Sequence, residues 1–286
     1  MGVRGGPPRA GLDGAAQRSA ATLVAVTVSA LIRARDEVDG IGPLLDELRR
    51  QTLPVEVVVI DSGSTDGTVP SARARGVEPL HLEPGAFSYG RALNRAAAAA
   101  SGDVLVAISA HARPPDPGWA ARMQAGLADA RVACAFGERL APDLRPLREP
   151  LLQDRAHAHR HPFYGYSNAA GAFRRGLWEQ RPFDEGLAAS EDKEWALHWL
   201  AQGMLVRLDP ALAVHHSHAD EGPLRTFRRA RGDYAATRSF RPVPRVPVRA
   251  AMREWWLGPH AHASPLRARL DPRRAAMLAG KWAALR

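Results

Sequence analysis

Three short apolar runs, each ending in a polar turn, constrain the fold of this chain more than any other feature. They are Leu23–Arg33, Val55–Ile60 and Asp103–Ser109, rich in valine and isoleucine and too short to span a bilayer. Length and composition predict buried strands. Segments with the apolar spacing of helices separate them, at 41–51, 69–75 and 91–100. The alternation predicts an α/β fold, with a Rossmann-like, mostly parallel central sheet and helices on both faces.

The turns that follow these strands are the first candidates for a binding site. Ligands bind such sheets at the carboxyl ends of the strands. The turns there are Arg33–Glu37, Asp61–Asp66 and Ser109–Arg113. We therefore expect their polar side chains to face one common ligand.

The pattern loosens after Trp119. The spacing predicts helices over 119–130 and 190–202, and strands over 78–82, 132–136, 164–173 and 204–214. A stretch rich in proline, arginine and histidine covers 141–162, and we interpret its His157, His159 and His161 as part of a solvated loop on the acceptor side.

Composition narrows the class of protein. The chain has 286 residues, 45% of them hydrophobic, and a single cysteine, which excludes an internal disulfide and fits a reducing cytoplasm. The formal net charge of +9 favours acidic partners, such as nucleotide phosphates, an acidic carrier protein or an anionic membrane. Nucleic acid is not expected, because the few aromatics are not interleaved with the arginines as stacking platforms would be.

We predict three regions along the chain. Residues 1–22 form a disordered leader, residues 23–240 a catalytic domain, and residues 241–286 a basic, helical C-terminal extension. The domain divides into a nucleotide-binding half, 23–118, and an acceptor half, 119–240. The apolar cluster Met252–Leu257 packs on the domain or on a second copy in a homodimer, or else contacts a membrane surface peripherally.

Four motifs in a fixed order resemble family 2 glycosyltransferases, which have the GT-A fold. They are Val28–Glu37, Val57–Thr68, Ser190–Trp195 and the histidines at 215–218. The resemblance covers about Thr27 to Arg231 and is best to the bacterial rhamnosyltransferase-like branch. It implies an inverting transferase that uses a UDP- or dTDP-type sugar. The acceptor stays open between a natural-product aglycone, a carrier-bound substrate and a lipid-linked saccharide.

The resemblance also implies a donor site. Asp61 would contact the base or ribose of the nucleotide, and the alternative is a plain turn, with Thr65 or Asp66 capping the next helix. The full set of expected donor-binding residues is Arg33, Arg35, Glu37, Asp61, Ser62, Arg91, Asn94, Ser109, Ala110 and His111.

The sequence departs from its family where an Asp-x-Asp usually holds a divalent cation. Ser109-Ala110-His111 stands there instead. Two arrangements are open. In the first, His111 and one or both of His216 and His218 hold a divalent cation, manganese or magnesium, with magnesium the poorer fit because imidazole is a ligand. In the second, the histidines and Arg113 meet the donor diphosphate directly.

The expected catalytic group is an acid at the start of a helix. Ser190 is the expected N-cap, and the resemblance makes Asp192 the general base, with Glu191 as the second candidate. The alternative is that both acids merely complement the helix dipole. Asn168 and Trp195 would line the sugar or acceptor pocket.

Two other functions are compatible with parts of this sequence. A sugar nucleotidyltransferase of related fold would need a glycine-rich, lysine-containing loop after the first strand, and Arg33–Glu37 lacks one. A catalytically degenerate donor-binding homologue would explain the lost Asp-x-Asp, but the retained Glu191-Asp192 pair argues against it.

Overall fold

The computed structural model describes residues 27–143, 145–216, 221–243 and 271–285, together with residues 245, 247, 249 and 252. Its strands are β1 (Val28–Ala34), β2 (Val55–Asp61), β3 (Leu80–His81), β4 (Val104–Ser109), β5 (Val132–Gly137), β6 (Leu151–Gln153), β7 (Ala170–Arg174) and β8 (Leu205–Asp209). Its helices are α1 (Val38–Arg49), α2 (Thr68–Arg73), α3 (Tyr89–Ala99), α4 (Trp119–Ala125), α5 (Arg155–Arg160), α6 (Arg175–Gln180), α7 (Glu191–Ala201), α8 (Pro223–Phe240) and α11 (Pro272–Leu285). Two short 3₁₀ turns, Pro84–Ala86 and Pro210–Leu212, complete the described elements.

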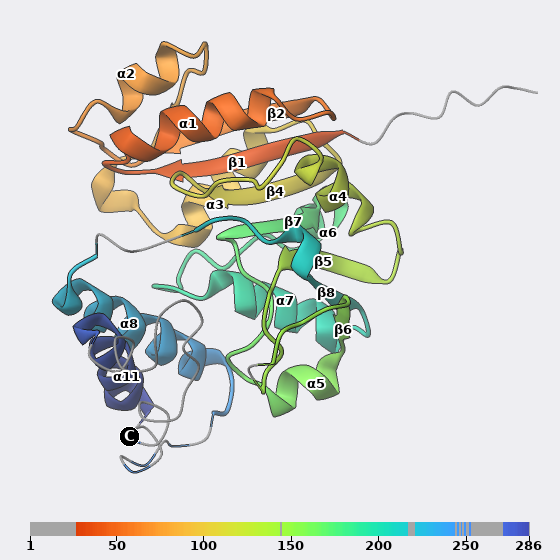
Figure 1. The fold of residues 1–286 in the computed structure, drawn as a ribbon, viewed down its shortest axis with the longest axis vertical. Coiled ribbons are helices and arrows are strands. Elements are labelled where there is room, and N and C mark those ends of the chain that lie inside the picture. Colours follow the sequence, from red (N-terminus) through yellow and green to blue (C-terminus); the bar gives the residue numbers. More distant parts are fainter. Residues whose placement is uncertain are drawn as a thin grey trace, which may run out of the picture.

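The described strands form one sheet in the order β3-β2-β1-β4-β7-β5-β8-β6 (Figure 1). The pairs β1–β2, β1–β4, β2–β3 and β5–β8 are parallel, and β7 runs antiparallel to both β4 and β5. The predicted mostly parallel α/β sheet is therefore confirmed, and β7 is the strand that joins its two parts.

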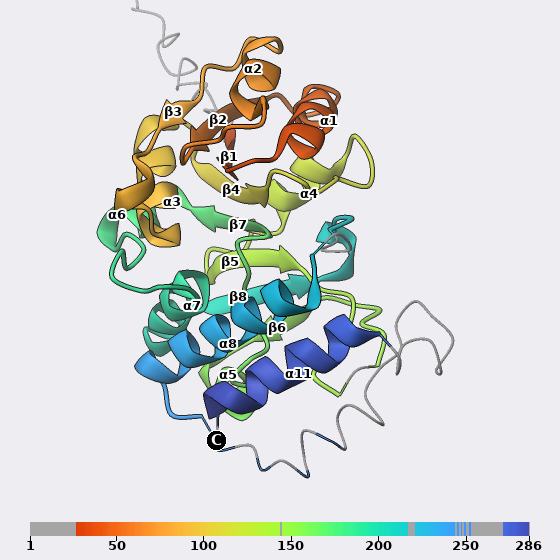
Figure 2. The same cartoon turned by 90° about the vertical axis from the view of Figure 1, so that its left-hand side faces the viewer.

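Helices cover both faces of the sheet, as the alternation of strands and helices predicted (Figure 2). On one face, Ile41, Leu44 and Leu48 of α1 and Trp119 of α4 pack on β1 and β4. On the other face, the cluster holds side chains of α3, α6 and α7. Side chains alternate between the two layers along each strand, so that Leu31 belongs to the second cluster while its neighbours belong to the first. Both faces of the central strands are thus buried, which explains their continuous apolar runs.

Several predicted boundaries are wrong. The strand expected over 204–214 ends at Asp209, because Pro210 opens a 3₁₀ turn in which the Asp209 carboxylate accepts from the Ala211 amide at 2.9 Å. The strand expected over 164–173 is formed only from Ala170 on, in β7. The part of the first predicted strand before Thr27 lies outside the described residues.

His157 and His159 lie on helix α5, and His161 directly follows it, so these histidines do not form the expected loop. Asp154 is the N-cap of α5, and its carboxylate accepts from the His157 amide at 2.7 Å. The rings of His157 and His161, four residues apart, lie 4.7 Å from each other. The N-cap at Asp154 therefore allows a helix to form here, although proline, arginine and histidine in this stretch had suggested a loop.

At the end of the molecule, α8 and α11 lie side by side (Figures 1 and 2). They touch closely at Gly280, where a Cβ atom would stand 2.5 Å from the Phe227 carbonyl oxygen and 3.0 Å from the Arg231 nitrogen. The predicted leader and the apolar residues Trp255 to Leu257 lie outside the described residues. None of the described helices has the length and apolar character needed to cross a membrane.

Trp195, expected in an acceptor pocket, belongs instead to the core. Its side chain is fully buried, and its indole N–H donates to the Arg181 carbonyl at 2.6 Å. Its ring contacts Phe173 and Phe183, with centroids 5.7 and 5.6 Å away. The prediction of a pocket role is wrong because the apolar face of α7 is turned toward the sheet.

We therefore predict that Trp195→Ala lowers the free energy of unfolding by about 3–5 kcal/mol, because it leaves a large cavity in the core. Trp195→Phe keeps most of the ring contacts and should cost clearly less. Urea unfolding followed by circular dichroism measures both. An alanine variant of normal stability would contradict the core assignment.

Candidate active site

The carboxyl ends of three parallel strands meet at one edge of the sheet. Arg33 of β1 pairs with Ile60 of β2 and with Ser109 of β4, and the next residue, Ala34, pairs with Asp61. The three polar turns expected to share a ligand are therefore neighbours, as the sequence predicted.

The turn after β2 is organised by Asp61. Its buried carboxylate accepts from the amides of Gly63 and Ser64, both at 3.0 Å, and from the Ser64 hydroxyl. The Ser64 hydroxyl also accepts from the Asp36 amide, which links this turn to the one after β1. Asp61 thus forms its own turn, and its contact with a nucleotide stays a prediction.

The end of β4 carries an imidazole held by a carboxylate. His111 Nδ1 lies 3.0 and 3.1 Å from the two carboxylate oxygens of Glu37, the residue before α1. The backbone beside it is packed tightly, since a Cβ atom on Gly40 of α1 would stand 2.9 Å from the Ala110 carbonyl oxygen. Glu37 therefore orients His111, as carboxylates orient ligating histidines in metal sites.

His216 reaches the same place from the segment after β8. The amide of Arg113 donates to the His215 carbonyl at 2.8 Å, and the reverse bond measures 2.9 Å. The rings of His111 and His216 are stacked, with centroids 4.7 Å apart and planes inclined by 12°. The two histidines thus meet, as predicted, while His218 lies outside the described residues.

This stacking does not fit an ion shared by His111 and His216. An imidazole nitrogen binds a metal in the plane of its ring, and two nearly parallel, stacked planes do not meet at a nearby point. Among the described residues there is also no group of three or more histidine, cysteine, aspartate or glutamate side chains that could hold a metal ion. A cation here would meet His111 through Nε2, with Glu37 orienting the ring.

Two buried carboxylates open α7 and face the same edge. Glu191 is 4% exposed and Asp192 9% exposed. The Glu191 carboxylate lies 3.3 Å from Arg33 Nη1 and accepts from the Asn168 side-chain amide, also at 3.3 Å. The Asp192 carboxylate accepts from the backbone amides of Asn168 at 3.0 Å and Lys193 at 2.7 Å. Asn168, expected on the acceptor side, therefore holds both acids.

The surroundings of Glu191 favour its protonated form. Burial, and then the adjacent Asp192 charge, raise the pKa of Glu191, and Arg33 offsets only part of this effect. Such a perturbed acid beside a second one is typical of catalytic sites.

Two buried polar atoms beside the acids have no hydrogen-bond partner among the described residues, Asn168 Oδ1 and the Tyr166 hydroxyl. Burial, and then the proximity of the ionisable groups Cys134, Asp192 and Glu191, raise the pKa of Tyr166 far above its ordinary value. Buried polar groups are nearly always paired in native proteins, so these two atoms are available to hydrogen-bond a bound ligand.

Arg33 connects the strand ends to an aromatic side chain that the sequence analysis missed. Its guanidinium lies 4.9 Å from the ring centroid of Tyr89, the first residue of α3, while also pairing with Glu191. Phe87 meets Tyr89 edge to face at 5.1 Å. Nothing in the spacing of Phe87 and Tyr89 along the sequence indicated a contact with Arg33.

The donor role expected for Asn94 is not supported. Both ends of its amide are used: Nδ2 donates to the Phe183 carbonyl at 2.9 Å, and Oδ1 accepts from Trp178 Nε1 and the Phe183 amide, both at 3.0 Å. Asn94 therefore ties α3 to the loop before α7. Arg91 pairs with Glu185 of the same loop at 2.7 Å.

The remaining donor candidates lie on the turns themselves. Arg35 is exposed, Ser62 is buried with its amide donating to the Ala34 carbonyl at 3.1 Å, and the Ala110 side chain is buried in the core. Ala110 could therefore contact a ligand through its backbone but not through its side chain.

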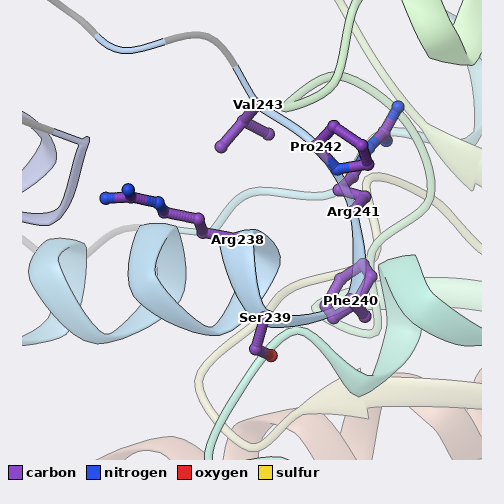
Figure 3. A pocket seen from close by; sticks show the side chains of 6 residues that line it. All are labelled: Arg238, Ser239, Phe240, Arg241, Pro242 and Val243. Carbon is purple, nitrogen blue, oxygen red and sulfur yellow. The ribbon is translucent and has the colours of Figure 1, made fainter.

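A cavity of about 410 Å³ at the end of α8 is a separate feature (Figure 3). Its lining is the continuous stretch Arg238–Val243, which contains no carboxylate or imidazole. Arg241 donates to the carbonyls of Ala158 and Pro162, at 2.8 and 3.1 Å. This cavity has no group that could take a proton, so the candidate site remains the edge that carries Glu191 and Asp192.

The fold belongs to the class of GT-A glycosyltransferase structures. The chain is similar to the mannosyltransferase PcManGT of Pyrobaculum calidifontis, solved with GDP-Man and Mn2+, with a TM-score of 0.66 and 20% identity over 91% of this chain and 87% of that one. It is also similar to TarS of S. aureus, with a TM-score of 0.53 and 15% identity over 87% and 72% of the two chains.

The sequence places the chain within that class. Residues 29–179 match the model of glycosyl transferase family 2, and the chain belongs to this family. It is 26% identical to the O-antigen chain rhamnosyltransferase RfbN of Salmonella typhimurium over 61% of each protein. It is 35% identical to the glucosyl-3-phosphoglycerate synthase of Mycolicibacterium paratuberculosis over 32% of this chain and 30% of the relative. The matches to these two relatives span less than two thirds of the length of each relative. The family resemblance that the motifs predicted is confirmed by the match to the family model.

The raised pKa of Glu191 makes a prediction about stability. An acid with a raised pKa stabilises the folded state fully only below its ordinary pKa, and this contribution is lost as the pH rises through the raised value. Glu191→Gln cannot ionise, so it should melt at a higher temperature than the wild type at about pH 8, with the difference shrinking toward about pH 5. Glu179→Gln, at an exposed site on α6, is the control and should show no such trend. A Glu191→Gln variant less stable than wild type throughout this range would refute the assignment.

Proposed function

We propose that the protein is an inverting glycosyltransferase that moves a sugar from a nucleotide-diphosphate donor to an acceptor hydroxyl. The observation that carries this proposal is the buried Glu191–Asp192 pair at the start of α7, fixed by Arg33 and Asn168 at the edge where the strand ends meet. Membership of glycosyl transferase family 2 supports the class of reaction.

In the proposed reaction Asp192 is the general base. Its two backbone hydrogen bonds, from Asn168 and Lys193, fix the carboxylate so that an oxygen lone pair can face an acceptor hydroxyl. Asp192 takes the proton while the acceptor oxygen bonds to the anomeric carbon and the bond to the diphosphate breaks. A single displacement of this kind inverts the anomeric configuration.

Glu191 and its partners would hold the reacting groups in place. Glu191 fixes Arg33, and a guanidinium at the end of β1 would stabilise the negative charge of the departing diphosphate. The buried Asn168 Oδ1 is an acceptor that a sugar hydroxyl would satisfy. Asp61 and the turn it organises would meet the nucleoside.

A divalent cation is part of the proposal. The PcManGT structure, similar in fold, contains Mn2+ together with its donor. In this chain His111 would hold the ion, with Glu37 orienting its ring, and an imidazole ligand suits manganese better than magnesium. When bound, the ion would neutralise the donor diphosphate.

The proposal for the sugar and the acceptor comes from sequence similarity. Similarity to an O-antigen chain rhamnosyltransferase favours a deoxysugar donor of the dTDP type and a saccharide acceptor on a lipid, over an aglycone or a carrier-bound substrate. Release of nucleoside diphosphate from a panel of UDP-, dTDP- and GDP-sugars, with and without saccharide acceptors, would test donor and reaction together. Release of pyrophosphate from a nucleoside triphosphate and a sugar phosphate, in a parallel assay, would instead indicate a nucleotidyltransferase. Failure to bind any nucleoside diphosphate would refute the proposal.

We predict that Asp192→Asn lowers turnover by about 10²–10⁴ while donor affinity stays within a few-fold, because the amide keeps the shape but cannot take a proton. Turnover and calorimetric titration with the donor's nucleoside diphosphate, measured on the same preparation, decide the point. Near-normal turnover of Asp192→Asn would transfer the base role to Glu191.

We also predict that a chelator abolishes turnover and that manganese restores it better than magnesium. His111→Ala should weaken donor binding in manganese but change binding little in chelator, because the ion would already be absent. Full turnover in chelator would favour the alternative in which the histidines meet the diphosphate directly.

A further inference from the structure

The residue that precedes the acid pair has an unusual backbone. Ser190 lies in the left-handed region, with φ 62° and ψ 25°. Among the described non-glycine residues it shares a positive φ only with Asp36. A side chain in this region is strained and persists only where the surroundings hold it. Because Ser190 leads directly into Glu191 and Asp192, its backbone angles set the direction of both carboxylates.

The Ser190 hydroxyl does not cap its own helix. A serine at an N-cap normally accepts from an amide of the first turn, and the sequence predicted that role. In the structure its side chain makes no capping bond to α7. It donates instead to the Asp233 carbonyl of α8, at 3.2 Å.

A second hydroxyl on α8 completes this contact. Thr237 Oγ1 donates to Ser190 Oγ at 3.2 Å and lies 2.9 Å from the same Asp233 carbonyl oxygen. Thr237 is 2% exposed and Ser190 8% exposed, so water does not compete freely for these bonds. The buried Ser190–Thr237 pair therefore links the entry of α7 to α8.

We propose that Thr237 is a positioning residue, which holds the acid pair in its reactive direction through Ser190. This inference rests on the function proposed above. If α8 did not fix Ser190, the chain could relax toward ordinary backbone angles and turn the first residues of α7. A displacement of about 1 Å at a reacting group can cost on the order of 10²-fold in rate.

α8 offers a matched control for this proposal. Thr226 lies three helical turns before Thr237, is 6% exposed, and donates to the carbonyl of Gly222, four residues back, at 3.2 Å. Its hydroxyl contacts Glu221 rather than α7. Thr226→Val and Thr237→Val therefore each remove a hydroxyl that contacts the carbonyl four residues back in α8, and only the second removes the donor to Ser190.

We expect Thr237→Val to lower kcat by about tenfold or more with donor affinity unchanged, Thr226→Val to leave kcat near wild type, and Thr237→Ser to restore it. Ser190→Gly tolerates the left-handed backbone but lacks the hydroxyl, so it should show the same loss of kcat without a loss of thermal stability. Equal kcat in the two valine variants, or a Ser190→Gly variant with wild-type kcat, would overturn the proposal.

Hydrogen exchange separates this proposal from the proposed function. Amides of residues 190–194 should exchange faster in Thr237→Val than in wild type or Thr226→Val, whether or not a donor is turned over. A wild type that releases no nucleoside diphosphate from any donor would end the proposed function alone. Unchanged exchange at 190–194 in Thr237→Val would end the positioning role, even in an active enzyme.

Discussion

Two buried carboxylates, Glu191 and Asp192, lie side by side in this protein. Several elements of the fold contribute the groups that pair with them and hydrogen-bond to them. Buried negative charge is strongly unfavourable unless it is paired and hydrogen-bonded. Arg33 comes from the parallel part of the sheet, Asn168 precedes the antiparallel strand β7, and the amide of Lys193 belongs to α7 itself. The site is therefore complete only when both parts of the sheet are folded and joined.

A carboxylate from another part of the chain lies at the end of β4. The Glu37 carboxylate contacts His111, although the two residues are far apart in sequence. This juxtaposition depends on the close approach of α1 to the turn after β4, which requires Gly40. The start of α1 thus contributes a side chain to the edge of the sheet at which the strands end.

The sequence predicted the parts of the fold that depend on local pattern. The apolar runs of β1, β2 and β4 are buried on both faces, so their composition alone identified them, and the strand ends then located the binding edge. Trp195 and Asn94 were misassigned because their partners, Phe173 and Phe183, are distant in sequence. Periodicity indicates that a side chain faces inward, but it does not distinguish a core from a pocket. The roles of Asp61 and Asp192 toward substrate remain predictions.

The close contact of α8 with α11 at Gly280 has a consequence for how this protein could diversify. Residues 241–271 connect two helices that are already packed together, so the ends of this connection are fixed beside the element that contacts the entry of α7. The pairing of α8 with α11 holds these two ends in place whatever the length of the chain between them. Homologues could therefore differ in this connection and acquire new surface near the entry of α7, while the sheet and its acids stay unchanged.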